Sequence, residues 1–441
     1  MDGKESLLGR LMGNAEKFTR KQVAQTVQLL LEHGARWQAS DIHIEPHEQY
    51  VLVRYRIDGH LRSAHKIPRK ALPALLEQCK EMALLDPKEV LAPQQGNFQT
   101  TVKDTSYTVQ ITTMPVYGGE KLVLHLTAQA KAPVPLAALG YWGKNLESMQ
   151  TALARSFGTI IVTAPKHHGR PTTQASMVAA LNNPALSIAT IEEHLSYRIP
   201  HANQTAVNPR SGLSMLKGLQ AVLHQDPNVV VVGSITDKDV ADLTIETGMS
   251  GHLVVAGMHS DSAVSSLLHL RALGVPDYLM ASSIKIVCAQ RLVRKLCEHC
   301  RMRTAITESQ LEQLKKSFNI SGPAAFKRIH ELEIEAIESG IGEDKRPSTS
   351  SKTITHLWRP NREGCEACGH TGYNGRTALT EVLTFSDRVH KALLDPKTTS
   401  ASLQASLIKN EGFVPLALDG ITKSLRGHVA MHDVLRVTHT A

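Results

Sequence analysis

The sequence predicts an α/β protein with a small N-terminal α/β domain, a larger domain built on a parallel sheet, and a helical C-terminus. Three observations support this class. Alternation of apolar and polar residues indicates a strand pair between Ile42 and Ile57. After residue 138, short apolar runs alternate with helical segments, as crossover connections between parallel strands require. The length of 441 residues is enough for two or three domains with sizeable cores.

The chain is expected to begin with a helix over residues 16–32, and we assign residues 1–36 to an N-terminal helical segment. The apolar residues that recur there at helical spacing are Val23, Val27, Leu30 and Leu31. Residues 37–128 are assigned to the small α/β domain. Its predicted elements are a strand pair over Ile42–Ile57 ending at the Asp58-Gly59 turn, a helix over Leu72–Leu85, and strands over Phe98–Leu126.

Residues 129–137 belong to an Ala- and Pro-rich stretch that we interpret as a linker. The sheet domain follows over residues 138–290. Strands that alternate with helical segments return in parallel, so we expect a parallel sheet with crossover helices. The predicted strands are Thr159–Val162, Ser187–Ile191, Val229–Val232 and Leu253–Val255.

Four of the six cysteines form two C-x-x-C pairs, which can supply four thiolates to one tetrahedral Zn²⁺ ion. Reduced, unligated cysteines are the alternative. We assign residues 291–376 to a zinc-binding module with a polar insertion, Ser339–His356, which we expect to be flexible. The region 377–441 is expected to be helical from Leu379 onward. The predicted zinc ligands are Cys297, Cys300, Cys365 and Cys368, with His299 and His370 in reserve.

The stretch IIVTAPKHHGRPTTQAS, residues 160–176, places a loop between an apolar strand and a helix, where a phosphate-binding loop would lie. Such a loop carries Lys and then Ser or Thr after its last glycine, but here Arg170 and Pro171 follow Gly169. Arginine keeps the charge in a different shape, and proline offers neither a backbone N–H nor a hydroxyl for Mg²⁺. The residues alone do not decide between a dismantled phosphate-binding loop and a loop that never bound phosphate.

The formal net charge of +8 permits anionic partners, but a solvated surface with a modest excess of Lys and Arg explains it as well. The basic residues are dispersed, and no aromatic ladder for stacking bases accompanies them. We find neither a signal peptide nor an apolar run long enough to span a bilayer. These features favour the cytoplasm as the site of action.

The segments of the chain also occur in a recognisable order. ASDIHIEPHEQYVLVRYRIDGHLR, QDPNVVVVGSITD, TGMSGHLVVAGMHSDSA and GCEACGHTGYNGRTALTEVL follow one another as in the secretion and type IV pilus assembly motor ATPases. The chain resembles this family over residues 20–430. The resemblance implies a cytoplasmic ring hexamer with a RecA-like core, and ATP hydrolysis with Mg²⁺ between subunits. It also implies a zinc-binding module and a platform protein of the inner membrane as partner.

Compared with this family, the residues of the nucleotide site depart consistently toward the loss of catalytic and metal-binding groups. Arg170 and Pro171 stand where the family has Lys and a hydroxyl, and Ser234 replaces its glutamate. Three further residues stand where the family has arginine: Thr236, Gln110 and His125. Ser196 stands where it has a glutamate. By resemblance, the catalytic candidates are Glu192, Glu193 and His259, and the nucleotide-binding candidates are Ala164, Gly169, Arg170, Pro171, Thr172, Thr173 and Asp226.

We therefore expect a motor-family subunit of a pilus, competence or type II secretion machine that hydrolyses ATP poorly or not at all. Zinc is the expected cofactor, and the departures weigh against binding of ATP and Mg²⁺. The expected partners are other subunits of a homo- or hetero-hexamer, including an active paralogue, and the platform protein at the cytoplasmic face of the inner membrane. Two alternatives stay open: an active motor that uses Arg170 with Glu192 or Glu193, and a zinc-bearing nucleic-acid-binding protein.

Overall fold

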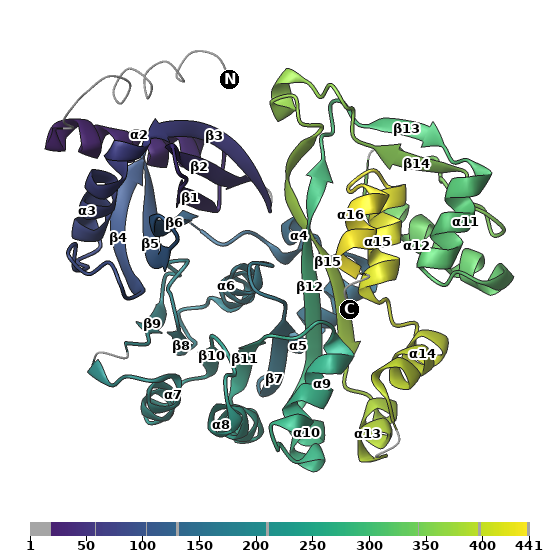
Figure 1. Ribbon diagram of the computed structural model, residues 1–441. Helices are drawn as coiled ribbons and strands as arrows, with labels where there is room; N and C mark the ends of the chain where they lie inside the picture. The colour runs from purple at the N-terminus through teal and green to yellow at the C-terminus, as the bar shows by residue number, and fades with distance from the viewer. Residues whose placement is uncertain are drawn as a thin grey trace. The chain divides into compact units, whose positions relative to one another are not determined.

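A computed structural model describes residues 19–57, 59–102, 104–128, 132–208, 211–342, 344–395 and 398–438 of the chain (Figure 1). The chain forms two compact units, Met1–Ala130 and Lys131–Ala441. The predicted helix start at residues 16–18, the turn residue Asp58 and linker residues 129–131 lie outside the described residues. None of the helices in the described ranges is both long and apolar enough to cross a membrane.

The first unit is a six-stranded antiparallel sheet in the order β3-β2-β1-β6-β5-β4, with helices packed on one face. The predicted apolar face of the first helix is confirmed, because its four residues are buried in the core of this unit. The elements are α2 Arg20–Arg36, β1 Asp41–Pro46, β2 Tyr50–Ile57, β3 His60–Pro68, η1 Arg69–Ala71, α3 Leu72–Met82, β4 Gln94–Val102, β5 Thr105–Val116 and β6 Gly119–Ala128.

The second unit is built on a seven-stranded sheet in the order β15-β12-β7-β11-β10-β8-β9. All neighbouring strands are parallel except β15, which pairs antiparallel with β12. The prediction of a parallel sheet is thus confirmed, and its four predicted strands are present. The strands are β7 Gly158–Thr163, β8 Ile188–Glu192, β9 Ala202–Ala206, β10 Val229–Val232, β11 Leu253–Met258, β12 Ile284–Leu296 and β15 Tyr373–Thr384.

Helices cover both faces of this sheet, which explains why its strands are continuously apolar rather than alternating. Ile160 and Val162 pack with α5 and α6, whereas Ile161 between them packs on the opposite face with α8 and α9. The helices are α4 Leu136–Leu139, α5 Gly143–Leu153, α6 Arg170–Leu181, α7 Met215–Leu223, α8 Lys238–Met249, α9 Ala263–Ala272 and α10 Asp277–Ser283.

The cysteine module lies between β12 and β15, which run side by side through the unit (Figure 1). The expectation that the chain is helical from Leu379 is wrong for its first six residues, because Leu379–Thr384 belong to β15. This run is buried on both faces, and periodicity alone cannot separate such a strand from a buried helix. The remaining elements are β13 Met302–Ala305, α11 Glu308–Ser317, α12 Gly322–Glu338, β14 His356–Arg359, η3 Glu366–Cys368, α13 Asp387–Leu394, α14 Ser400–Glu411, α15 Leu416–Leu425 and α16 Met431–Thr438.

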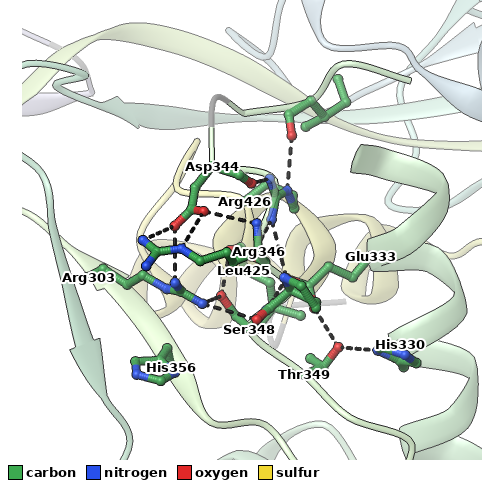
Figure 2. A network of polar contacts seen from close by, with 12 residues as sticks. Arg303, His330, Glu333, Asp344, Arg346, Ser348, Thr349, His356, Leu425 and Arg426 are labelled. Carbon is green, nitrogen blue, oxygen red and sulfur yellow. Dashed lines mark hydrogen bonds and ion pairs between the residues drawn. The ribbon is translucent and has the colours of Figure 1, made fainter. Parts of the chain in front are cut away.

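The polar insertion, expected to be flexible, is packed against α12 and the end of α15 by a polar network (Figure 2). Glu333 of α12 is fully buried and accepts hydrogen bonds from the Ser348 N–H, at 2.7 Å, and from the Thr349 hydroxyl. Its carboxylate lies 3.5 Å from the buried guanidinium of Arg426, which donates in turn to backbone carbonyls of the insertion. Asp344 lies between Arg303 and the exposed Arg346 (Figure 2). Buried polar partners therefore fix a segment whose composition indicates disorder.

Replacing Glu333 tests this network. We expect Glu333→Gln to destabilise the protein by about 3 kcal/mol or more, because it removes the main charge partner of the buried Arg426 guanidinium. Denaturant unfolding measures the loss. The control is Glu331→Gln on the same helix, whose side chain is 49% exposed and which should change stability by less than about 0.5 kcal/mol. Equal effects of the two substitutions would contradict the role given to Glu333.

Candidate phosphate-binding loop and metal centre

The loop between β7 and α6 lies at the carboxyl edge of the parallel sheet, where α/β proteins usually bind ligands. The Ala164 N–H donates to the Met258 carbonyl at 3.3 Å, which ties the start of the loop to β11. Gly169 precedes the helix with φ +81°, a left-handed conformation that suits glycine. The loop therefore presents the N-terminus of α6 at this edge, as a phosphate-binding loop does.

Arg170, the first residue of α6, turns inward rather than along the loop. Its side chain lies over the carboxyl ends of β10 and β11, and its Nη1 donates to Ser234 Oγ at 3.2 Å. The neighbouring strand leaves room for it, because a Cβ on Gly257 would lie 2.9 Å from Arg170 Nε. Only 7% of Arg170 is exposed, and this burial lowers the pKa of its guanidinium. Arg170 and Ser234, two residues at which the sequence departs from a nucleotide site, thus bond to each other.

The first turn of α6 has no hydroxyl at Pro171, and the two following threonines use theirs elsewhere. Thr172 Oγ1 accepts from the Tyr197 hydroxyl at 3.1 Å, and Thr173 Oγ1 donates to Gln290 Oε1 at 2.6 Å. Ser234 offers the end of β10 a hydroxyl in place of a carboxylate. Mg²⁺ binds carboxylate oxygens together with phosphates and water. The residues at this edge therefore do not fit an Mg²⁺ ion bound as in a phosphate-binding loop.

The catalytic candidates follow neighbouring strands at the same edge. Glu192 ends β8, where its Oε1 accepts from Thr190 Oγ1 at 2.7 Å, and burial raises the pKa of its carboxyl despite this bond. Glu193 is exposed. His259 follows β11 and donates from Nδ1 to the Ala164 carbonyl at 3.0 Å. These residues lie around the loop, but Glu192 is directed to its own strand and to β9 rather than to Arg170.

Asp226 is not brought to the loop. It is exposed and precedes β10 at the amino edge of the sheet, where the Pro227 carbonyl accepts from His252 Nδ1 at 2.7 Å. Because β10 and β7 belong to one parallel array, their amino ends lie at the edge opposite the loop. Within a single chain, Asp226 therefore does not share a site with Arg170.

Two residues that the sequence did not single out anchor the loop to β12. Gln290 Nε2 donates to the His168 carbonyl at 2.7 Å, and its Oε1 also accepts from the Tyr141 hydroxyl at 2.9 Å. The Leu292 N–H donates to His168 Nδ1 at 2.8 Å, so this nitrogen carries no proton. Burial lowers the pKa of His168 to about 4, which keeps the ring neutral and able to accept. The signal in the sequence that could have found this anchor was a glutamine within a largely apolar run, IVCAQRLV.

The four predicted cysteine ligands do meet, and strand pairing explains why. Leu296 of β12 lies opposite Tyr373 of β15, so the pair that follows β12 and the pair that precedes β15 lie together. Their four Sγ atoms are all within 4.8 Å of one another. The Cys297–Cys365 and Cys300–Cys368 sulfur distances are 3.7 and 3.9 Å. Four thiolates at such distances fit the tetrahedral coordination of Zn²⁺.

The ionisation of these thiols also suits a metal. Burial alone would raise the pKa of Cys368, but the backbone N–H groups of Cys365 and Gly372, each 3.2 Å from its sulfur, help to lower it to about 6. Burial and the neighbouring thiols raise the pKa of Cys300 to about 12. Four crowded thiolates repel one another unless a cation compensates them, and a divalent ion would supply that charge.

In the first unit, the two positions at which the resemblance implies arginines are paired with each other across β5 and β6. Gln110 lies opposite His125, whose Nδ1 is 2.8 Å from Asp41 Oδ1. Arg56 also pairs with Asp41, at 3.1 Å. Burial alone would raise the pKa of Asp41, but the His125 bond and the other partners lower it to about 2. These side chains form a local ion-pair cluster on the sheet.

Comparison with known proteins gives a consistent result. A family model described as "Type II/IV secretion system protein" matches residues 16–436. The chain is 32% identical to a type II secretion system protein E of Dickeya dadantii, over 94% of this chain and 76% of that protein. It is 32% identical to the type IV pilus assembly ATPase PilB of Thermus thermophilus, over 98% and 47% respectively. The ATPase DotB of Legionella pneumophila shares the fold, with a TM-score of 0.64 at 14% identity over 97% of this chain and 98% of that one.

Metal analysis tests the cysteine centre. We expect the purified protein to contain one Zn²⁺ per chain and Cys365→Ala to lose it, because three remaining thiolates no longer close the tetrahedron. Atomic emission on gel-filtered protein measures the content. Cys79→Ala, which removes a buried thiol of the first unit, should retain the metal. A metal content that does not depend on Cys365 would rule out this centre.

The anchor at His168 predicts a pH dependence. Its pKa is about 4 in the folded protein against an ordinary 6.5, so only the unfolded chain binds this proton between those values. Stability should therefore fall as the pH drops from about 6.5 to about 4, and this group adds nothing further below that. In His168→Gln, whose side-chain oxygen can still accept the Leu292 N–H, denaturant unfolding should show a shallower fall. His65 and His428 titrate with the same sign in both proteins, and exposed His224→Gln is the control. Identical pH profiles for His168→Gln and the unchanged protein would refute the anchor.

Proposed function

The chain belongs to the type II/IV secretion system protein family, and we propose that it is a motor-family subunit that has little or no ATPase activity. The family match supports the first part of this proposal. The arrangement at the carboxyl edge of the sheet supports the second. The nucleic-acid-binding alternative is not retained, because the matched residues 16–436 include both cysteine pairs that suggested it.

The contact between Arg170 and Ser234 is the observation that carries the proposal. An ATP-hydrolysing site of this kind needs a carboxylate that holds the metal or positions water beside the phosphate loop. Here that position carries a buried hydroxyl, which accepts from Arg170, the residue that stands at the lysine position of the loop. The removal of a positioned acid or base costs roughly 10²–10⁴ in rate. Because such groups act as a unit, one loss already leaves a slow enzyme.

An active motor is the second candidate, and one observation favours it. Glu192 ends the strand next to β10, and burial raises the pKa of its carboxyl, a property that general bases often have. Against this role, the carboxylate accepts from Thr190 and Gln204, and neither of these residues lies on the loop. Glu192 would have to change its partners in order to activate water at the α6 N-terminus.

We further propose that the subunit joins a ring in which a paralogue supplies hydrolysis. The fold on which assembly would depend is intact. Both sheets are formed, two buried ion pairs lie in the second unit, and the four cysteines are brought together. The family resemblance of the sequence implies a hexamer at the cytoplasmic face of the inner membrane with a platform protein as partner, and the relatives named as secretion and pilus proteins support such a machine. Zinc would stabilise the module between β12 and β15.

Hydrolysis by the purified chain tests the proposal directly. We expect phosphate release from ATP and Mg²⁺ to be slower by about 10² or more than in a paralogue with intact motifs, because the carboxylate at β10 and the hydroxyl at α6 are both replaced. The matched variant is Glu192→Gln, which should leave the residual rate unchanged. Turnover at the paralogue's rate that Glu192→Gln abolishes would favour the active motor instead.

Assembly is tested by mixing the chain with an intact paralogue. We expect the two to co-elute from gel filtration in one ring-sized species, with phosphate release that depends on the paralogue alone. Ser234→Ala should leave both results unchanged, because this hydroxyl contributes neither to hydrolysis nor to assembly. Failure to co-elute with any paralogue of the same cell would contradict the mixed ring.

A further inference from the structure

Among the described residues of the second unit, Arg170 is a buried cation that forms no ion pair with a carboxylate. Its side chain makes a single hydrogen bond there, to the neutral Ser234 hydroxyl, and its Nε is buried without a partner. The nearest carboxylate that affects its charge is Glu193, which is exposed. A guanidinium offers five N–H donors, so most of its capacity is unused. A buried charge in this state is costly, and an anion that reached it would relieve the cost.

The surroundings of Arg170 also favour an anion. It begins α6, a helix of 12 residues whose N-terminal N–H groups and dipole favour negative charge at this end. His259 donates from Nδ1 to the loop, so it adds no negative charge. The groups that contact the Arg170 side chain, the Ser234 hydroxyl and the Gly257 backbone, are neutral. The charged side chains that act at this edge are the exposed Lys166 and Glu193, which are of opposite sign. The helix terminus and the Arg170 guanidinium therefore both favour negative charge at the carboxyl edge of the sheet.

A divalent metal has no such support there. Pro171 and Ser234 remove the hydroxyl and the carboxylate that would hold Mg²⁺, and the threonine hydroxyls of α6 are engaged elsewhere. A cation that approached would also meet the fixed charge of Arg170, which only the exposed carboxylate of Glu193 opposes. Mg²⁺ bound to a polyphosphate cancels part of the negative charge that Arg170 would attract.

We propose that Arg170 replaces the metal ion, so that this site binds metal-free polyphosphate and Mg²⁺ weakens the binding. The inference rests on the proposed function, since it concerns the same loop, but it makes a separate claim. The ligand that the site would recognise is a chain of phosphates whose negative charge no metal ion neutralises. A free nucleotide and inorganic polyphosphate are two sources of it, and the experiment separates them.

The test is calorimetric titration of the full-length protein with sodium tripolyphosphate, and in parallel with ATP, in Mg²⁺-free buffer without chelator or in excess Mg²⁺. We expect both ligands to bind in the Mg²⁺-free buffer, and Mg²⁺ to weaken the affinity by about threefold or more because it neutralises ligand charge. Equal affinities for the two ligands identify phosphate as the sole determinant. Tighter binding of ATP adds a nucleoside contact and leaves the inference standing.

Two variants assign the effect to Arg170. Ser234→Asp keeps the arginine but gives it a carboxylate partner, and should weaken tripolyphosphate binding about tenfold or more, as should Arg170→Gln. Arg170→Lys should retain part of the affinity, which guards against a variant that fails to fold. The matched control is Arg271→Gln, whose residue pairs with Asp277 in another part of the unit and should not change binding.

Two results would overturn the inference: tighter binding in Mg²⁺ than in Mg²⁺-free buffer, or no binding of either ligand in Mg²⁺-free buffer. Neither result bears on the proposed function, because a site that needs Mg²⁺ to bind ATP, or binds nothing, can still fail to hydrolyse. Conversely, rapid phosphate release would defeat the proposed function whatever the titrations show.

Discussion

The antiparallel pairing of β12 with β15 determines where both candidate sites of the second unit lie. At one end, the pairing of Leu296 with Tyr373 brings together two cysteine pairs that are distant in sequence. Further along the same strand, Gln290 and the Leu292 N–H hold the loop before α6 through three hydrogen bonds with His168 and Thr173. The single strand β12 thus carries residues that position the candidate metal centre and residues that hold the loop. A change in the pairing of β12 would move both sites, because a register shift of one residue turns every side chain to the opposite face.

The pairing of buried charges differs between the core of this unit and the loop. Lys423 lies 2.7 Å from Asp419, and the Asp419 carboxylate also accepts from Trp142 Nε1, so this ion pair joins α15 to the rest of the core. The pair of Glu333 with Arg426 does the same for the polar insertion. Both pairs follow the rule that charges removed from water need partners. Arg170 departs from it, and it does so at the carboxyl edge of a parallel sheet, where a ligand can complete what the protein leaves open.

The sequence allowed some of this to be predicted and hid the rest for physical reasons. Short apolar runs predicted β7, β8, β10 and β11 because strands buried on both faces have few polar residues. Cysteine spacing predicted the metal ligands because the tetrahedron requires four thiolates. The strand at Leu379 was missed because a doubly buried run has no diagnostic period. The order in the polar insertion was missed because it depends on Glu333 and Arg426, which are distant in sequence and whose burial no local composition reveals.

The same distinction explains why the proposed loss of chemistry at the loop is compatible with the fold. Proline at the second position of α6 removes an N–H that a helix leaves unpaired anyway, and its fixed φ suits the first turn. Serine after β10 fills a buried position and accepts a hydrogen bond from Arg170. Each substitution satisfies local packing and backbone geometry, and neither gives a metal ion a ligand. A nucleotide site requires specific charged groups and metal ligands, whereas a helix start requires only suitable backbone geometry and packing. Substitutions that satisfy only the helix start leave a stable loop whose buried cation is Arg170.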